Sequence, residues 1–316
     1  MEHSIILGIS TCLLGENVRY DGGHKLDRFI RDTLGAYVTF VPVCPEVECG
    51  MSVPREALRL VGDPEQPRLV TQKTSRDYTD QMQSWGQTRL AQLQGEELCG
   101  YIFKSRSPSS GMERIKVYQE SGMPVNKGVG IWARMFMDHF PNLPVEDDGR
   151  LHDPMLRENF ITRIFVFQRW RELMRENRTL GGLVDFHTRH KLLIMAHHVP
   201  IYRELGKLVA AGKSMPLEEL FATYLNKLHY ALRLQSTTKK NVNVLHHLMG
   251  YFKRDLSKDE KQELVEIIDE YARGLFPLIV PITLVNHYVR KYEQPYLLNQ
   301  YYLHPHPLEL KLRNHV

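Results

Sequence analysis

Three of the four cysteines lie in short segments with the composition of turns. Cys12 belongs to TCLLG, and Cys44 and Cys49 enclose Glu46 in CPEVECG. Thiolates bind soft metals and iron–sulfur clusters, whereas one C-x4-C pair without a second pair is a poor structural zinc site. Three thiolates around a cubane would leave one iron open as a Lewis acid toward sulfur, and Glu46 would move protons or activate water. The competing interpretation is ordinary turns with buried cysteines, because free cysteine is common in protein cores.

The cysteine segments follow short apolar runs that are typical of β-strands. The runs cover residues 4–10, 37–43 and 98–104, with a weaker one at 143–145, and helical patterns lie between them at 24–35, 75–94 and 128–140. This alternation predicts an α/β Rossmann-like domain with a mainly parallel sheet. Ligands of open α/β sheets bind beyond the carboxyl ends of the strands. We therefore expect the cysteine segments and the hydroxyl-rich SRSPSSG (105–111) to meet at one sheet edge.

The second half of the chain has helical periodicity. Glycines and prolines divide this pattern into the stretches 155–176, 181–197, 199–211, 216–235, 239–254, 257–274 and 281–292. The pattern predicts an all-α domain that follows the α/β domain. We place the domains at 1–150 and 151–316, with a linker around 147–154 (DDGRLHDP).

The two halves also differ in charge. The chain of 316 residues has a net charge of +4, made up of 17 Lys and Arg against 20 Asp and Glu in 1–150 (−3) and 24 against 17 in the rest (+7). A basic domain indicates a polyanionic partner, although a solvated helical surface has the same composition. The chain has neither an apolar run near the ~20 residues of a membrane span nor a visible secretory signal. We therefore expect a cytoplasmic protein with reduced cysteines and no membrane partner.

Three motifs resemble the thiouracil desulfidase (TudS) family. They are TCLLGENVRYDGGHK (11–25), VPVCPEVECGMSVPRE (41–56) and KSRSPSSGMERIKVY (104–118), and the resemblance spans about residues 4–147. It implies a [4Fe-4S] cluster with three protein ligands and one open iron that captures a thiocarbonyl sulfur. It further implies that water replaces this sulfur without net redox change.

The resemblance also implies roles for individual residues. Cys12 and Cys49 are the implied cluster and metal ligands, with Cys44 as the alternative second ligand. Glu46 is the implied catalytic acid and base. Ser107 is expected to assist proton transfer or substrate positioning.

The third motif departs from the family pattern, because Ser110 stands where the family has a cysteine. A neutral hydroxyl is a poor iron ligand compared with a thiolate. We assign position 110 to the cluster site, and three explanations stay open: a deliberate Cys→Ser substitution, a natural variant with a rearranged ligand set, or an inactive protein. Cys99 does not replace it, since it lies near the start of the 98–104 run, roughly 20 Å along the strand from the loop.

The second half resembles the YbgA-like domain, which accompanies the desulfidase domain in fused proteins. The segment 184–213 and the helices after it carry this resemblance. The fused proteins look like tRNA 4-thiouridine desulfidases, so the helical domain is expected to bring tRNA to the cluster through its phosphates. The basic residues expected to contact nucleic acid are Arg189, Lys191, Lys239, Lys240, Lys253, Arg254, Arg290 and Lys291.

These observations favour an enzyme that converts 4-thiouridine in tRNA to uridine and releases hydrosulfide. The base must leave its stack to reach a buried site. Free thiouracil or a thiolated nucleotide is the alternative substrate. Two other classes stay open: a non-enzymatic iron–sulfur protein that binds RNA or senses redox state, and a zinc-dependent hydrolase.

Overall fold

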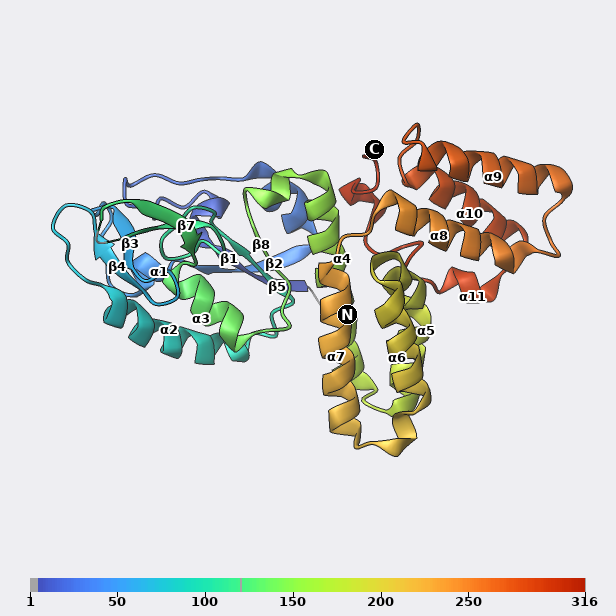
Figure 1. The fold of residues 1–316 in the computed structure, drawn as a ribbon, viewed down its shortest axis with the longest axis horizontal. Coiled ribbons are helices and arrows are strands. Elements are labelled where there is room, and N and C mark those ends of the chain that lie inside the picture. The colour runs from blue at the N-terminus through green and yellow to red at the C-terminus, as the bar shows by residue number, and fades with distance from the viewer. Residues whose placement is uncertain (1–4, 120, 316) are drawn as a thin grey trace. The chain divides into compact units, whose positions relative to one another are not determined.

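The computed structural model describes residues 5–119 and 121–315, which form parts of two compact units. The first unit is Met1–Asp153 and the second is Pro154–Val316. Figure 1 labels the elements of both units. The sequence analysis placed the division at residue 150, close to this point. No helix among the described residues is long and apolar enough to span a membrane.

The first unit contains a parallel sheet of the predicted kind. Its strands are β1 (Ile5–Ser10), β2 (Val38–Val43), β5 (Gly100–Phe103) and β8 (Val145–Asp147), in the order β2-β1-β5-β8. All three neighbouring pairs are parallel, with Ser10 opposite Val43 and Phe103 opposite Asp147. The prediction of an α/β domain with a mainly parallel sheet is therefore confirmed. The parallel register brings the carboxyl ends of all four strands to one edge.

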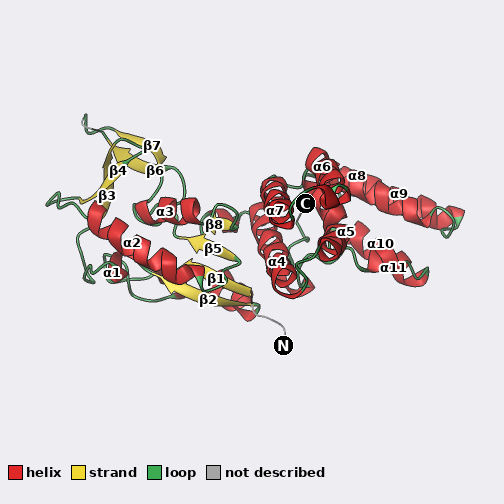
Figure 2. Ribbon diagram, turned by 90° about the horizontal axis from the view of Figure 1, so that it is seen from below, coloured by secondary structure: helices red, strands yellow, loops and turns green. Residues whose placement is uncertain are grey.

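Two helices cover one face of this sheet through an aromatic cluster. They are α2 (Thr79–Gln94) and α3 (Ile131–His139), which lie side by side in Figure 2. Tyr101 of β5 is fully buried, with its ring centroid 4.5 Å from that of Phe136 and its hydroxyl accepting a hydrogen bond from the Trp132 indole. Aromatic pairs at these separations add to the burial of their area. The cluster thereby holds β5 and α3 in a defined position.

The prediction of a helix at residues 24–35 is wrong for the first half of this range. The structure has a π-helical turn at Phe29–Thr33 and a 3-10 turn at Leu34–Ala36. Residues 24–27, which precede these turns, are not helical. Their N–H groups bond elsewhere: Lys25 N donates to Cys12 O (2.9 Å) and Asp27 N donates to Leu13 O (3.0 Å). Tertiary hydrogen bonds therefore override the amphipathic pattern.

A second sheet, which the sequence analysis did not predict, completes the first unit. Its strands are β3 (Leu58–Gly62), β4 (Pro67–Thr71), β6 (Ile115–Tyr118) and β7 (Pro124–Gly128), in the order β4-β3-β6-β7. β3 and β4 are antiparallel, β6 and β7 are antiparallel, and β3 and β6 are parallel. The unit also has a one-turn helix α1 (Pro45–Glu48) and a 3-10 turn at Thr11–Leu14.

The second unit is helical, as predicted. Its helices are α4 (Pro154–Glu176), α5 (Leu180–His197), α6 (Val199–Ala210), α7 (Leu217–Arg233), α8 (Thr238–Met249), α9 (Lys258–Ala272), α10 (Ile279–Lys291) and the short α11 (Pro295–Leu298). The helices α5, α6 and α7 pack against one another, and α8 packs against both α5 and α9. One apolar core with Trp170, Tyr224 and Tyr288 runs through the unit.

The residues around 147–154 do not form an open linker. β8 ends at Asp147, a 3-10 turn spans Arg150–His152, and α4 begins at Pro154. Asp147 and Leu151 are buried. Arg150 N donates to the Asp147 carboxylate over 2.8 Å, which closes this turn.

A prediction concerns Gly130, where α3 meets the loop after β5. A Cβ atom there would lie 2.5 Å from Ser109 O and 2.9 Å from Gly111 N, both backbone atoms that cannot rotate away. Gly130→Ala is expected to destabilise the first unit by about 1–3 kcal/mol. Gly95→Ala is the control, because its Cβ would meet no atom nearer than 3.5 Å. Hydrogen exchange of first-unit peptides at increasing urea concentrations measures the stability of both variants. Equal protection of the two variants would contradict the prediction.

Candidate functional site

A cavity of about 890 Å³ lies in the first unit and is lined from the carboxyl ends of its parallel strands. Ser10 and Cys12 come from β1 and the turn after it, and Val43 and Cys44 come from β2 and its end. The loop after β5 contributes the lining residues 104–110, and the segment after β8 contributes Arg150. The three loops that the sequence singled out therefore meet in one cavity.

Hydrogen bonds between these segments hold the cavity walls. Lys104 N donates to the Ser10 hydroxyl (2.9 Å), and Ser105 N donates to the Asp148 carboxylate (2.7 Å). The first N–H groups of α3 also bond the loop after β5, since Ala133 N donates to Ser109 O over 3.2 Å. A helix N-terminus has N–H groups without intrahelical partners, and here a carbonyl of the loop satisfies one of them.

Cys12 and Cys44 are the thiols that line the cavity. Burial raises the pKa of Cys12 to about 12 and also raises the pKa of Cys44. The charge of Cys44 adds to the rise at Cys12, so the two groups lie within electrostatic range of each other. Because burial outweighs the nearby cationic side chains, both thiols are protonated at neutral pH unless a metal ion binds them.

Cys49 lies at the other end of the α1 turn from Cys44. Its Sγ lies 3.3 Å from Glu46 O, and its side chain packs in an apolar cluster with Leu58 and Leu60. Burial, followed by the charges of Glu46 and Cys44, raises its pKa to about 11. Cys44, the alternative ligand of the sequence analysis, thus lines the cavity, whereas Cys49 packs beside it.

Glu46 stands at the centre of a hydrogen-bonded network in the cavity. Its Oε2 accepts hydrogen bonds from Arg55 Nε (3.0 Å) and from Arg55 Nη2. Both side chains of this ion pair are largely buried. Its Oε1 accepts from the Ser109 hydroxyl over 2.7 Å. The Ser107 hydroxyl lies 3.0 Å from that of Ser109 and accepts from Ser110 N. The structure therefore connects Glu46 to Ser107 through Ser109.

Sequence reasoning missed Arg55 and Ser109. Both lie inside the motifs VPVCPEVECGMSVPRE and KSRSPSSGMERIKVY. The signal in the sequence is that Arg55 is the only cation in the second motif, which also contains Glu46. The pairing of the two depends on how the chain turns at residues 50–55.

Ser110 lines the same cavity and is 3% exposed. Among the described residues, no three His, Cys, Asp or Glu side chains stand close enough together to hold a metal ion. At the cavity wall the donor set consists of two thiols and a hydroxyl, and the third thiol nearby is that of Cys49. Cys99 is buried at the start of β5, where its N–H bonds Ile6 O.

The cavity wall is strongly cationic. Three lining residues, Lys25, Arg106 and Arg114, have no ion-pair partner among the described residues. The backbone of Arg106 (φ 58°) and of Arg114 (φ 55°) lies in the left-handed region, which non-glycine residues seldom adopt. Such backbone strain is most common at functional sites. The free cations give the cavity the electrostatics of an anion-binding site.

The eight basic residues expected to contact nucleic acid differ in their surroundings. Lys239, Lys253, Arg254 and Arg290 are exposed and have no ion-pair partner among the residues that the structure describes. The other four have partners: Arg189 pairs with Asp185, Lys191 lies over the Tyr296 ring, Lys240 donates to backbone carbonyls and Lys291 pairs with Glu260.

Comparisons with known proteins assign a family to each half of the chain. The family model described as 2-thiouracil desulfurase matches residues 7–148, and the one described as protein of unknown function (DUF1722) matches residues 191–307. The uncharacterized protein YbgA of Escherichia coli (strain K12) is 32% identical over 158 residues, which are 50% of this chain and 94% of YbgA. The chain therefore belongs to the YbgA family and carries a 2-thiouracil desulfurase domain in its first half.

Two further relatives match the chain in part. The uncharacterized protein YbbK of Bacillus subtilis (strain 168) is 28% identical over 132 residues, which are 40% of this chain and 86% of YbbK. A solved structure titled [4Fe-4S]-dependent thiouracil desulfidase TudS is 27% identical and covers 48% of this chain and 95% of its own, with a TM-score of 0.39.

A second prediction tests the pair of Arg55 and Glu46. Removing the guanidinium leaves a largely buried carboxylate without its cation, so Arg55→Met is expected to destabilise the first unit by about 1–3 kcal/mol. Arg68→Met is the control, because its ion pair with Asp77 is exposed and is expected to contribute little. Hydrogen exchange of first-unit peptides in urea compares the two variants. Equal losses would show that the Arg55 pair has no special role.

Proposed function

We propose that the chain removes sulfur from 4-thiouridine in tRNA by replacing it with oxygen from water. The observation that carries this proposal is the link from Glu46 through Ser109 to Ser107 in a cavity that also presents two thiols. In the balanced reaction, a C=S group and water give a C=O group and hydrogen sulfide. No electrons are gained or lost by the substrate.

Glu46 is the acid and base of this proposal. Its Oε2 accepts hydrogen bonds from Arg55, and its Oε1 accepts a hydrogen bond from the Ser109 hydroxyl. A proton taken from water at Ser107 would pass through Ser109 to Oε1, and the steps from Ser107 onward follow hydrogen bonds that the structure contains. The same proton would return to the departing sulfur, while the oxygen of the water remains on the base.

Three thiols of the first unit are ligands of the soft type that an iron–sulfur cluster needs, although in the structure they do not stand close enough together to hold a metal ion. Cys44 lies within electrostatic range of both Cys12 and Cys49, since its charge raises the pKa of each. In this proposal these three cysteines hold a [4Fe-4S] cluster with one open iron, and Cys49 supplies the thiolate that position 110 lacks. When bound, such a cluster supplies a Lewis acid for the thiocarbonyl sulfur.

The unpaired cations of the cavity wall support a substrate that carries phosphate. Lys25, Arg106 and Arg114 would bind the negatively charged phosphate of such a substrate next to the reacting base. The exposed basic residues of the second unit, such as Lys253 and Arg254, support contact with a longer polyanion. Free thiouracil has no phosphate and would leave these cations unused.

A third prediction concerns the cluster ligands. After anaerobic reconstitution, the parent chain is expected to hold about four irons and four sulfides. Cys12→Ser, Cys44→Ser and Cys49→Ser are each expected to lose most of this iron, whereas Cys99→Ser is expected to match the parent. Iron and sulfide analysis with the visible absorption spectrum measures this. A Cys49→Ser chain with a full cluster, or a cluster that forms only after Ser110→Cys, would contradict the ligand set.

A fourth prediction concerns the reaction itself. The reconstituted chain is expected to convert 4-thiouridine in tRNA to uridine, as counted by nucleoside mass spectrometry. Glu46→Gln is expected to slow conversion about 10²–10⁴-fold, and Ser109→Ala to slow it less, because each removes part of the proton path. Iron content serves as the control for both variants.

Parallel reactions with free 4-thiouridine and 2-thiouracil separate the substrate classes. If the free nucleoside and the free base are converted as fast as 4-thiouridine in tRNA, the proposal that tRNA is the substrate is wrong. A cluster-loaded chain that binds tRNA without converting any base would show a binding or sensing protein instead.

A further inference from the structure

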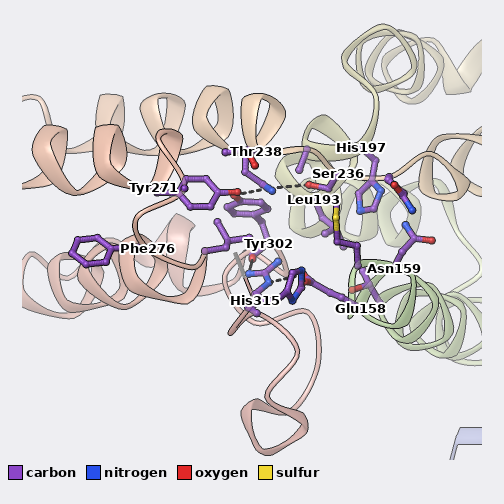
Figure 3. A pocket seen from close by; sticks show the side chains of 18 residues that line it. Glu158, Asn159, Leu193, His197, Ser236, Thr238, Tyr271, Phe276, Tyr302 and His315 are labelled. Carbon is purple, nitrogen blue, oxygen red and sulfur yellow. Dashed lines mark hydrogen bonds and ion pairs between the residues drawn. The ribbon is translucent and has the colours of Figure 1, made fainter. Parts of the chain in front are cut away.

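The second unit has a pocket of its own, which the sequence did not suggest. It has a volume of about 110 Å³ and is lined from α4, α5, α8, α9 and the C-terminal segment. Figure 3 shows Tyr271 and Phe276 on one side of it and His197 and Asn159 on the other. One water molecule needs roughly 10–15 Å³ of such volume, so the pocket has room for a group of about eight non-hydrogen atoms.

His197 presents an unused acceptor in this pocket. Its side chain is 4% exposed, and its Nδ1 lies 2.6 Å from Leu234 O. A carbonyl oxygen only accepts, so Nδ1 carries the ring proton and Nε2 has a bare lone pair. Nε2 has no hydrogen-bond partner among the described residues. Burial lowers the pKa of His197 to about 4, so the ring is neutral at pH 7.

The other charged groups of the pocket neutralise each other. Arg313 Nε lies 3.2 Å from Glu158 Oε1, and His315 lies 3.6 Å from the other oxygen of that carboxylate. The pocket therefore offers no net charge to an occupant. An ionic ligand would lose its hydration without gaining a free counter-ion.

The remaining walls include aromatic rings and the Asn241 amide, whose oxygen already accepts hydrogen bonds. Asn241 Oδ1 accepts from the hydroxyls of both Tyr302 and Ser236, each over 3.0 Å. The rings of Tyr271, Phe276 and Tyr302 line the pocket together with this amide. Aromatic walls with fixed polar groups are suited to a flat ring that also forms hydrogen bonds.

We propose that this pocket binds a neutral nucleobase of pyrimidine size, whose ring N–H donates to His197 Nε2. Size, neutrality, aromatic walls and the unpaired Nε2 of a buried histidine all favour this ligand. The base is supplied either by an unpaired nucleotide of RNA or by a free nucleoside, which share this chemistry. The proposal does not depend on the reaction proposed for the first unit.

The test titrates the full chain with uridine and with N3-methyluridine, followed by ligand-observed NMR. Uridine is expected to bind in the millimolar range or better. N3-methyluridine lacks the ring N–H and is expected to bind about tenfold or more weakly, because His197 then stays unpaired. This comparison needs no variant, so it does not depend on how the chain tolerates substitution. Equal binding of the two nucleosides, or no binding of uridine, would overturn the proposal.

Two variants assign the binding to this pocket. His197→Phe is expected to abolish it, whereas His187→Phe is expected to retain it. His187 is a matched control, since it is also buried in α5 and bonds Tyr224 but does not line the pocket. Binding that persists in His197→Phe would belong to another site and would overturn the proposal. Competition between uridine and a short oligouridylate shows whether the base comes from RNA.

Discussion

The parallel register of β2, β1, β5 and β8 is the constraint on which the candidate site depends. Parallel strands end at the same edge of a sheet, so segments that are more than a hundred residues apart in sequence meet there. Cys12, Cys44, Ser110 and Arg150 share one cavity for this reason. The aromatic packing of Tyr101 against α3 then holds the third loop in place, because α3 begins against the carbonyls of that loop.

Two kinds of electrostatics operate within this cavity. The thiols are buried, which favours their protonated forms and makes a positively charged metal centre the natural means of ionising them. The carboxylate of Glu46 is paired with the Arg55 guanidinium, and both side chains are largely buried. Unpaired cations such as Arg106 lie further along the same wall. Thiols, a carboxylate paired with an arginine, and unpaired cations thus share one cavity.

Local sequence patterns predicted the main elements of the fold. They could not predict contacts between residues that are far apart in the sequence. The apolar runs predicted the parallel sheet, and helical periodicity predicted the second unit. The second sheet was missed because its strands, such as Ile115–Tyr118, are four or five residues long and carry charges. The pairing of Arg55 with Glu46 and the non-helical backbone at residues 24–27 both involve tertiary contacts, about which a periodic pattern carries no information.

The hydrogen bonds from Lys25 and Asp27 to the carbonyls of Cys12 and Leu13 have a consequence for the evolution of this domain. They fasten the backbone on both sides of the excursion between residues 14 and 24, using peptide groups that every amino acid except proline possesses. Exposed side chains of the loop between these two points can therefore change without moving the first thiol, whereas its backbone is constrained because Val18 O accepts a hydrogen bond from Arg55 Nη2 over 3.0 Å. A family with this arrangement can alter what it admits to the cavity while it keeps the chemistry inside.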